Sequence, residues 1–235
     1  ARSTQGHASL PARLGRSRAL VGGDPALLQR ISAHGHDARA RRDVAYVFEA
    51  APEKLPLNQQ LFAEPESLTA PDTVLASNSS AIPSTRIGEK LQHRDRVIGT
   101  HFWNPPHLVP LVEVTQNEKT SGETVTRTMT LLREAGRNPV HVKKDIPGFV
   151  GNRLQHALWR EAISLVERGI CDAETVDNVI KAAFGRRLPV VGPPENAAPI
   201  GTHLALAYHQ PVLAALDSPP GPSPTWARPV APGKV

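Results

Sequence analysis

Hydrophobic and polar positions follow two alternating patterns in the middle of the chain. Short apolar runs rich in Val, Ile, Phe and Tyr are typical of buried strands. They predict strands at residues 44–48, 73–76, 96–102, 111–115 and 139–142. Between these runs, apolar residues recur at helical spacing and predict helices at residues 57–68, 83–91 and 120–136. Strands that alternate with helices favour an α/β fold with a largely parallel sheet.

Local signals mark where some of these helices begin and end. Pro65 is expected to interrupt the first helix, because proline lacks the amide that a helix interior needs. Thr120 and Glu123 have the spacing of a capping box, which predicts a helix start at Thr120. Gly136 is expected to end that helix, since glycine tolerates the left-handed conformation found after a C-terminus.

Only helical periodicity is found after residue 147. One predicted helix ends at Gly169, a second is capped by Asp172 and ends at Gly185, and a third covers residues 201–216. The change from alternating strands and helices to helices alone predicts a domain boundary near residue 146. We therefore expect an α/β domain at residues 31–146, followed by a smaller all-α domain at residues 147–218.

The positive charge is concentrated at one end of the chain. The 235 residues carry a formal net charge of +5, yet residues 1–42 hold eight arginines and two acidic residues. The arginines have no interleaved aromatic residues, which argues against a nucleic-acid partner. We expect residues 1–30 to form a basic, poorly ordered leader. Proline is enriched in residues 219–235, which are expected to form a Pro-rich tail.

Composition excludes several classes of protein. No apolar run approaches the roughly 20 residues that span a membrane. The single cysteine, Cys171, excludes an internal disulfide and a zinc site with several thiolates. His34 and His36 lack a third ligand at suitable spacing, so no metal site is predicted. These features predict a cytoplasmic protein.

The start of the chain suggests processing. Its first residue is Ala1 and its single methionine is Met129, so we expect a processed or truncated product. Residues 1–23 are rich in Arg, Ser, Gly and Ala and contain no acidic residue, a composition typical of transit segments. The alternative location is therefore an organellar matrix.

The most informative residues for chemistry are His101 and Glu113. His101 ends a predicted strand, where open α/β sheets bind ligands, and Glu113 lies within the next strand. An imidazole paired with a carboxylate is a common general base, because the carboxylate fixes the tautomer and stabilises the imidazolium. Spacing alone leaves a structural role for this histidine open.

Five segments in order resemble the L-3-hydroxyacyl-CoA dehydrogenase family, which includes 3-hydroxybutyryl-CoA and lambda-crystallin-like dehydrogenases. They are EAAPE at 49–53, ASNSS at 76–80, GTHFWNP at 99–105, LVEV at 111–114 and PGFVGNR at 147–153. Their separations fit the family over about two-thirds of the chain, between Glu49 and Asn196. Together they are far more specific than any single motif.

The resemblance implies a role for particular residues. His101 corresponds to the catalytic base and Glu113 to the carboxylate that pairs with it. Ser80 and Asn152 correspond to residues that bind substrate. The residues that correspond to cofactor contacts are Glu53, Ser80 and Asn104. By themselves, the serines at 77–80 could form a turn or helix cap, and Asn152 could cap a helix.

The implied activity is oxidation of the 3-hydroxyl of a 3-hydroxyacyl-CoA to a ketone with NAD, in a homodimer formed through the helical domain. Two alternatives stay open. One is a non-catalytic remnant that binds acyl-CoA or only dimerises. The other is a dehydrogenase of a free hydroxy acid or sugar acid. No membrane or nucleic-acid partner is expected.

The chain also departs from the family pattern near its start. The glycine-rich turn that cradles a dinucleotide pyrophosphate is not present, because Gly22 and Gly23 follow no strand and lack the third glycine. We therefore expect an incomplete Rossmann-like domain in which the strand at residues 44–48 has an unpaired edge. Asn58 stands where the family carries a lysine.

Overall fold

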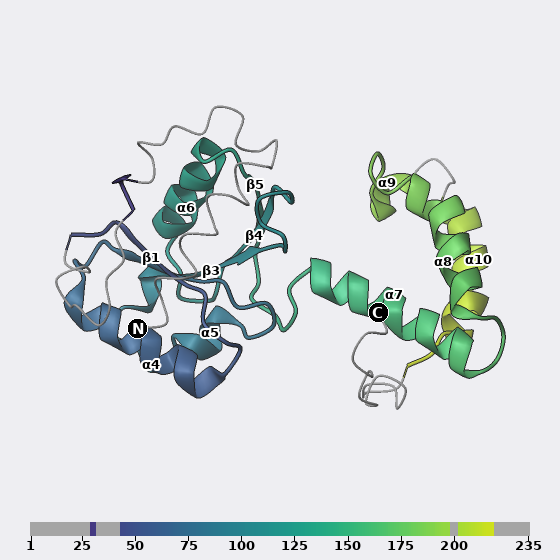
Figure 1. The fold of residues 1–235 in the computed structure, drawn as a ribbon, viewed down its shortest axis with the longest axis horizontal. Helices are drawn as coiled ribbons and strands as arrows, with labels where there is room; N and C mark the ends of the chain where they lie inside the picture. Colours follow the sequence, from purple (N-terminus) through teal and green to yellow (C-terminus); the bar gives the residue numbers. More distant parts are fainter. Residues whose placement is uncertain (1–28, 32–42, 198–201, 219–235) are drawn as a thin grey trace. The chain divides into compact units, whose positions relative to one another are not determined.

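The computed structural model describes residues 29–31, 43–197 and 202–218 (Figure 1). Most of the expected leader, His34 and His36, the glycines at 22 and 23, and the expected tail lie outside these residues. The chain divides into two compact units between Asn152 and Arg153. The first unit holds a sheet and its covering helices, and the second is helical.

The first unit is built on a five-stranded sheet with the strands in chain order. The strands are β1 (Tyr46–Glu49), β2 (Val74–Ser77), β3 (Val97–Phe102), β4 (Leu111–Thr115) and β5 (Asn138–Val142). Three of the four pairings are parallel, and β3 with β4 is antiparallel. This confirms the expected α/β class with a mostly parallel, Rossmann-like sheet. The antiparallel pair follows from its connection, which is too short for a parallel crossover.

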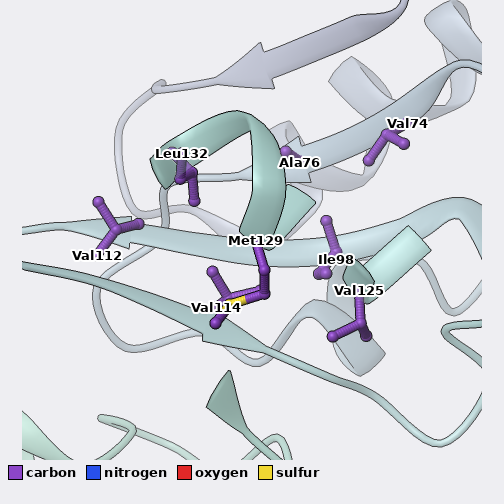
Figure 2. Packing of buried hydrophobic residues seen from close by; sticks show 8 residues of the cluster. All are labelled: Val74, Ala76, Ile98, Val112, Val114, Val125, Met129 and Leu132. Carbon is purple, nitrogen blue, oxygen red and sulfur yellow. The ribbon is translucent and has the colours of Figure 1, made fainter. Parts of the chain in front are cut away.

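Helix α6 (Gly122–Glu134) covers one face of this sheet. Its Val125, Met129 and Leu132 pack against strand residues that all point to the same side (Figure 2). Because successive strand residues point to opposite faces, every second position contributes to this core. The strand members of the cluster are Val74, Ala76, Ile98, Val112 and Val114.

Helices α4 (Leu55–Leu68) and α5 (Ser84–Ile87) supply the core of the opposite face. Phe62 of α4 and Ile87 of α5 pack with Leu75 and Val97, the strand residues adjacent in sequence to those of the first cluster. The central strands β2, β3 and β4 are therefore buried on both sides, as expected for continuous apolar runs. The predicted helix at residues 83–91 is correct in place, but only its first half is helical.

Three local expectations need correction. Helix α4 continues through Pro65, whose buried ring packs inward and whose carbonyl accepts hydrogen bonds from the amide and hydroxyl of Thr69. The N-cap of α6 is Ser121, which accepts from the Thr124 amide at 3.1 Å, instead of Thr120. Helix α8 ends at Ala182, and Gly185 lies inside a following 3-10 turn, Phe184–Arg186.

The glycine expected to end α6 has that role. Gly136 adopts a φ of 70°, and the amide of Arg137 reaches back to the carbonyl of Leu132 at 2.9 Å. This is the left-handed turn that glycine permits without steric cost. It directs the chain from the helix into β5.

The second unit contains α7 (Gly151–Glu167) from Arg153 onward, together with α8 (Ala173–Ala182), α9 (Pro193–Ala197) and α10 (Thr202–Ala215). Asp172 caps α8 by accepting from the Thr175 amide at 2.7 Å, as the sequence predicts. Among its described residues, no hydrophobic side chain is buried, and Val190 is 82% exposed. No helix in the described ranges has the length and apolar character needed to cross a membrane.

Candidate active site

The pairing of β3 with β4 places His101 directly opposite Glu113. Nδ1 of His101 lies 2.9 Å from Oε2 of Glu113, and the two residues are only 5% and 1% exposed. The twelve-residue spacing therefore becomes one cross-strand contact. The structure brings together the two residues that the sequence singled out as base and carboxylate.

The Glu113 carboxylate accepts hydrogen bonds from several directions. Oε2 faces His101 and the indole Nε1 of Trp103, at 2.9 and 3.2 Å. Oε1 accepts from the backbone amides of Val150 and Gly151, at 2.9 and 3.0 Å. Burial by itself raises the pKa of Glu113, but the hydrogen bonds from His101, Gly151 and Val150 outweigh it and lower the pKa below 4.5.

This arrangement determines which nitrogen of His101 can accept a proton. An ionised Glu113 can only accept hydrogen bonds, so Nδ1 of His101 must carry the shared proton. Nε2 then holds the free lone pair. The rings of Trp103 and Phe149 flank the imidazole, with centroids 5.6 and 5.5 Å away. The pair can therefore act as an oriented general base.

A turn with unusual backbone geometry delivers the two amides to Glu113. Gly148 and Phe149 both have positive φ, at 73° and 47°. A positive φ is uncommon for a bulky residue such as phenylalanine and carries a steric cost. The buried Phe149 ring holds the turn in place, and the chain then enters α7 with its first amides facing the carboxylate. The helix N-terminus favours that negative charge.

Ser80 lies on a loop that is held by Glu53. The Glu53 carboxylate accepts from the amides of Ser80, Ala81 and Ile82, each at 3.0 Å, and from the hydroxyl of Ser79. Burial raises the pKa of Glu53, but the Ser79 hydroxyl and these amides lower it below its ordinary value. Glu53 therefore holds the Ser80 loop in place, and its contact with a cofactor stays a prediction.

Asn152 joins this loop to the start of α7. Its side-chain amide donates to the carbonyl of Ser80 at 2.9 Å. Short hydrogen-bonded steps therefore lead from His101 through Glu113 and the first turn of α7 to Ser80 and Glu53. Asn104, the remaining predicted site residue, is exposed in the turn after β3 and does not join these contacts.

The end of β1 carries a second buried carboxylate. Oε1 of Glu49 accepts from the side chain of Asn58 at 3.0 Å, and Oε2 accepts from the Ser77 hydroxyl at 2.8 Å. Asn58, noted above as a departure from the family pattern, is 1% exposed and donates to this carboxylate. The contacts link the ends of β1 and β2 with the first turn of α4.

Some functional contacts have no counterpart in the sequence predictions. The indole of Trp103, a residue given no role above, donates to Glu113. The general need of a buried indole N–H for an acceptor is the signal that could have indicated this bond. Asn78 also joins β2 to β3, because its side-chain oxygen accepts from the Phe102 amide at 2.9 Å. The hydrogen bonds from the backbone amides of Val150 and Gly151 to Glu113 cannot be predicted from residue types.

Comparison with known proteins shows the family of the chain. The model for the NAD-binding domain of 3-hydroxyacyl-CoA dehydrogenase matches residues 13–146, and the model for the C-terminal domain matches residues 148–230. The chain belongs to the 3-hydroxyacyl-CoA dehydrogenase family. These matches confirm the family resemblance found in the sequence. Members of this family are NAD-dependent oxidoreductases.

Relatives within the 3-hydroxyacyl-CoA dehydrogenase family differ in their substrates. A 5-formyl-3-hydroxy-2-methylpyridine 4-carboxylate 5-dehydrogenase of Mesorhizobium japonicum is 41% identical, over 63% of this chain and 48% of the relative. An L-carnitine dehydrogenase of Streptomyces coelicolor is 36% identical, over 72% of this chain and 54% of the relative. The chain thus spans about half the length of these relatives.

A solved structure in the family is similar too. The (S)-3-hydroxybutyryl-CoA dehydrogenase PaaH1 from Ralstonia eutropha is 28% identical, with a TM-score of 0.71. The match covers 89% of this chain and 74% of that structure.

One edge of the sheet is a candidate place for the NAD that the family uses. The parallel strands β1, β2 and β3 end near one another, and the exposed Ser80 and Asn104 follow β2 and β3. Open α/β sheets bind ligands at this edge. Ser80 and Asn104 are therefore the side chains at this edge that would contact bound NAD.

Proposed function

We propose that this chain carries the catalytic pair of an NAD-dependent dehydrogenase that oxidises the 3-hydroxyl of a 3-hydroxyacyl-CoA. The observation that supports this most directly is the contact between His101 and Glu113, which leaves Nε2 of His101 as the acceptor. NAD, when bound, would take up the hydride from carbon 3.

The protein's own groups would do the following. Nε2 of His101 removes the hydroxyl proton, and Glu113 stabilises the imidazolium that forms. Ser80 and Asn152, linked through the Ser80 carbonyl, bind and orient the substrate oxygen. Burial of the pair strengthens its electrostatic interaction, because water screens it less. In the reverse reaction, His101 returns the proton to the ketone oxygen.

A free hydroxy acid is the second candidate substrate. Two relatives carry the names of a pyridine carboxylate dehydrogenase and a carnitine dehydrogenase, neither of which denotes a CoA ester. The His101–Glu113 pair would perform the same proton transfer on either substrate, since the base contacts only the hydroxyl.

We also propose that the helical unit forms a homodimer with a second copy of the chain. Several of its described apolar side chains are exposed to solvent, including Leu154 at 59% and Val179 at 56%. Exposed apolar surface of this kind is characteristic of protein–protein interfaces. A second copy offers an identical surface, which a two-fold interface requires.

Substrate oxidation can be measured with the full chain by following NADH absorbance. We expect acetoacetyl-CoA to be reduced with NADH, and His101→Gln to lower kcat by roughly 10²–10⁴-fold. The matched control is His141→Gln, an exposed histidine on β5 that contacts Gln116. L-carnitine and 3-hydroxybutyrate with NAD test the free-acid alternative. If His101→Gln left the rate unchanged, the proposed mechanism would be wrong.

The same assay separates the catalytic proposal from the remnant alternative. Absence of turnover with every substrate, in a folded protein, would favour a non-catalytic remnant. Calorimetric titration with acetoacetyl-CoA alone would then show whether substrate binding persists. Titration with NAD measures cofactor binding independently of chemistry.

A further inference from the structure

The indole of Trp103 contacts the catalytic pair at an oxygen that the proposed mechanism already uses. Its Nε1 donates to Oε2 of Glu113 at 3.2 Å, and Nδ1 of His101 lies 2.9 Å from the same oxygen. The other oxygen, Oε1, is occupied by the amides of Val150 and Gly151. Trp103 and His101 therefore share one acceptor atom.

The position of the indole is restricted from two sides. Its ring centroid lies 5.6 Å from that of His101. On the other side it lies against Gly151, where an added Cβ would come within 2.2 Å of its Cζ2 atom. The first residue of α7 must therefore be glycine for the indole to fit as it does. Trp103 is held at Glu113 by packing as well as by its hydrogen bond.

We propose that Trp103 is a positioning residue that tunes how tightly His101 holds a proton by sharing Oε2 of Glu113. The catalytic consequence of this role rests on the proposed function. A donor on a carboxylate oxygen draws charge away from it, so the oxygen stabilises an adjacent imidazolium less. Glu113 is almost completely buried, which makes such competition stronger than it would be in water.

The direction of the effect follows from these contacts. Among the residues that the structure describes, Glu113 is the titratable side chain that contacts His101, whereas Trp103 and Phe149 present rings to it. Removing the indole N–H leaves Oε2 to His101 alone and strengthens that contact. The imidazole should then become protonated at higher pH.

The test is an NMR titration of the His101 ring in the full-length protein, assigned by comparison with His101→Gln. In Trp103→Phe, we expect the titration midpoint to move up by about 0.5 pH units, a roughly threefold change in proton affinity. Incorporation of benzothienylalanine at position 103 replaces the N–H by sulfur at nearly constant shape and should give the same shift. Trp159→Phe on α7 is the matched control and should leave the midpoint unchanged.

The pH dependence of kcat provides a second readout. Its acidic limb should move to higher pH in both variants at position 103, with KM changing less than kcat. A lower unfolding midpoint with an unchanged His101 titration would reduce Trp103 to a packing residue and overturn the inference. A downward shift would overturn it too. An upward shift in a protein without turnover would support Trp103 and contradict only the proposed function.

Discussion

At the level of single residues, Glu113 combines two properties that rarely occur together. It is 1% exposed, yet its pKa lies below the ordinary value because donors from His101 and the start of α7 outweigh the cost of burial. Its charge is therefore coupled to the folded state. A carboxylate with a lowered pKa stabilises the folded protein above its unfolded pKa, and this contribution disappears as the pH falls through the folded value.

We expect Glu113→Gln to lower the free energy of unfolding above about pH 4.5, because the neutral amide is a poorer acceptor for those donors. The difference from the unmodified protein should shrink as the pH falls, since Glu113 itself becomes protonated there. Urea unfolding over a series of pH values measures this. Glu89→Gln, at an exposed position, is the control. A difference that stays constant down to about pH 3 would contradict the expectation.

The sequence was informative about individual residues wherever a motif was in register. Five of the six predicted site residues lie in one set of contacts, from His101 to Glu53. The exception is Asn104, which is exposed in its turn. What residue types do not show is which group each side chain contacts. The resemblance implies only a cofactor contact for Glu53, whereas the structure shows that its oxygens also accept from three backbone amides of the Ser80 loop.

At the level of secondary structure, the start of α6 illustrates how local competition selects a cap. Thr120 and Ser121 are both good N-cap residues by type. The Thr120 hydroxyl donates instead to the carbonyl of Val97 at 2.6 Å and accepts from the Asn117 amide. That leaves Ser121 to cap the helix. A sequence pattern cannot detect the nearby strand carbonyl that decides between the two residues.

Replacing Ser121 by alanine should therefore destabilise the protein by about 1 kcal/mol, the usual value of an N-cap side chain. Urea unfolding gives the difference directly. Thr126→Ala serves as the comparison, because the exposed Thr126 hydroxyl bonds only the helix's own Gly122 carbonyl. A loss for Ser121→Ala no larger than that for Thr126→Ala would contradict the assignment of the cap.

The start of α7 gives a second prediction, because two helix-starting glycines differ in their surroundings. A Cβ at Gly151 would meet the Trp103 ring at 2.2 Å, whereas a Cβ at Gly122 would meet nothing within 4 Å. We expect Gly151→Ala to cost about 1–3 kcal/mol through overpacking. Gly122→Ala should be neutral or slightly stabilising, since alanine is the better helix former. Equal effects on thermal unfolding would contradict the close packing at Gly151.

At the level of the whole molecule, the two units differ in how they bury apolar side chains. The first unit has a core on each face of its sheet. In the second unit, no described hydrophobic residue is buried. Periodicity predicted α7, α8 and α10 but not the short helix α9, and it indicates only that a helix has an apolar face. It does not indicate which surface covers that face.

The proposed homodimer accounts for this difference and can be tested. We expect sedimentation to detect a dimer whose population rises with concentration, and Val179→Asp to shift it to monomer, because burying an unpaired carboxylate is costly. Lys181→Glu, which also adds negative charge to α8 and lies at a well-exposed position, should have a smaller effect. A monomer at every concentration would exclude the proposed interface.

The hydrogen bonds between Glu53 and the Ser80 loop limit how the length of this fold's connections can vary. Connections between elements usually tolerate insertions and deletions, because nothing depends on their length. The connection from β1 to α4 is different, since Glu49 at its start binds Ser77 and Glu53 near its end binds the amide of Ser80. One extra residue between these two glutamates would pull Ser80 away from Asn152 without touching either residue. The length of this short connection is thus limited by the need to keep Ser80 in contact with Asn152 at the candidate active site.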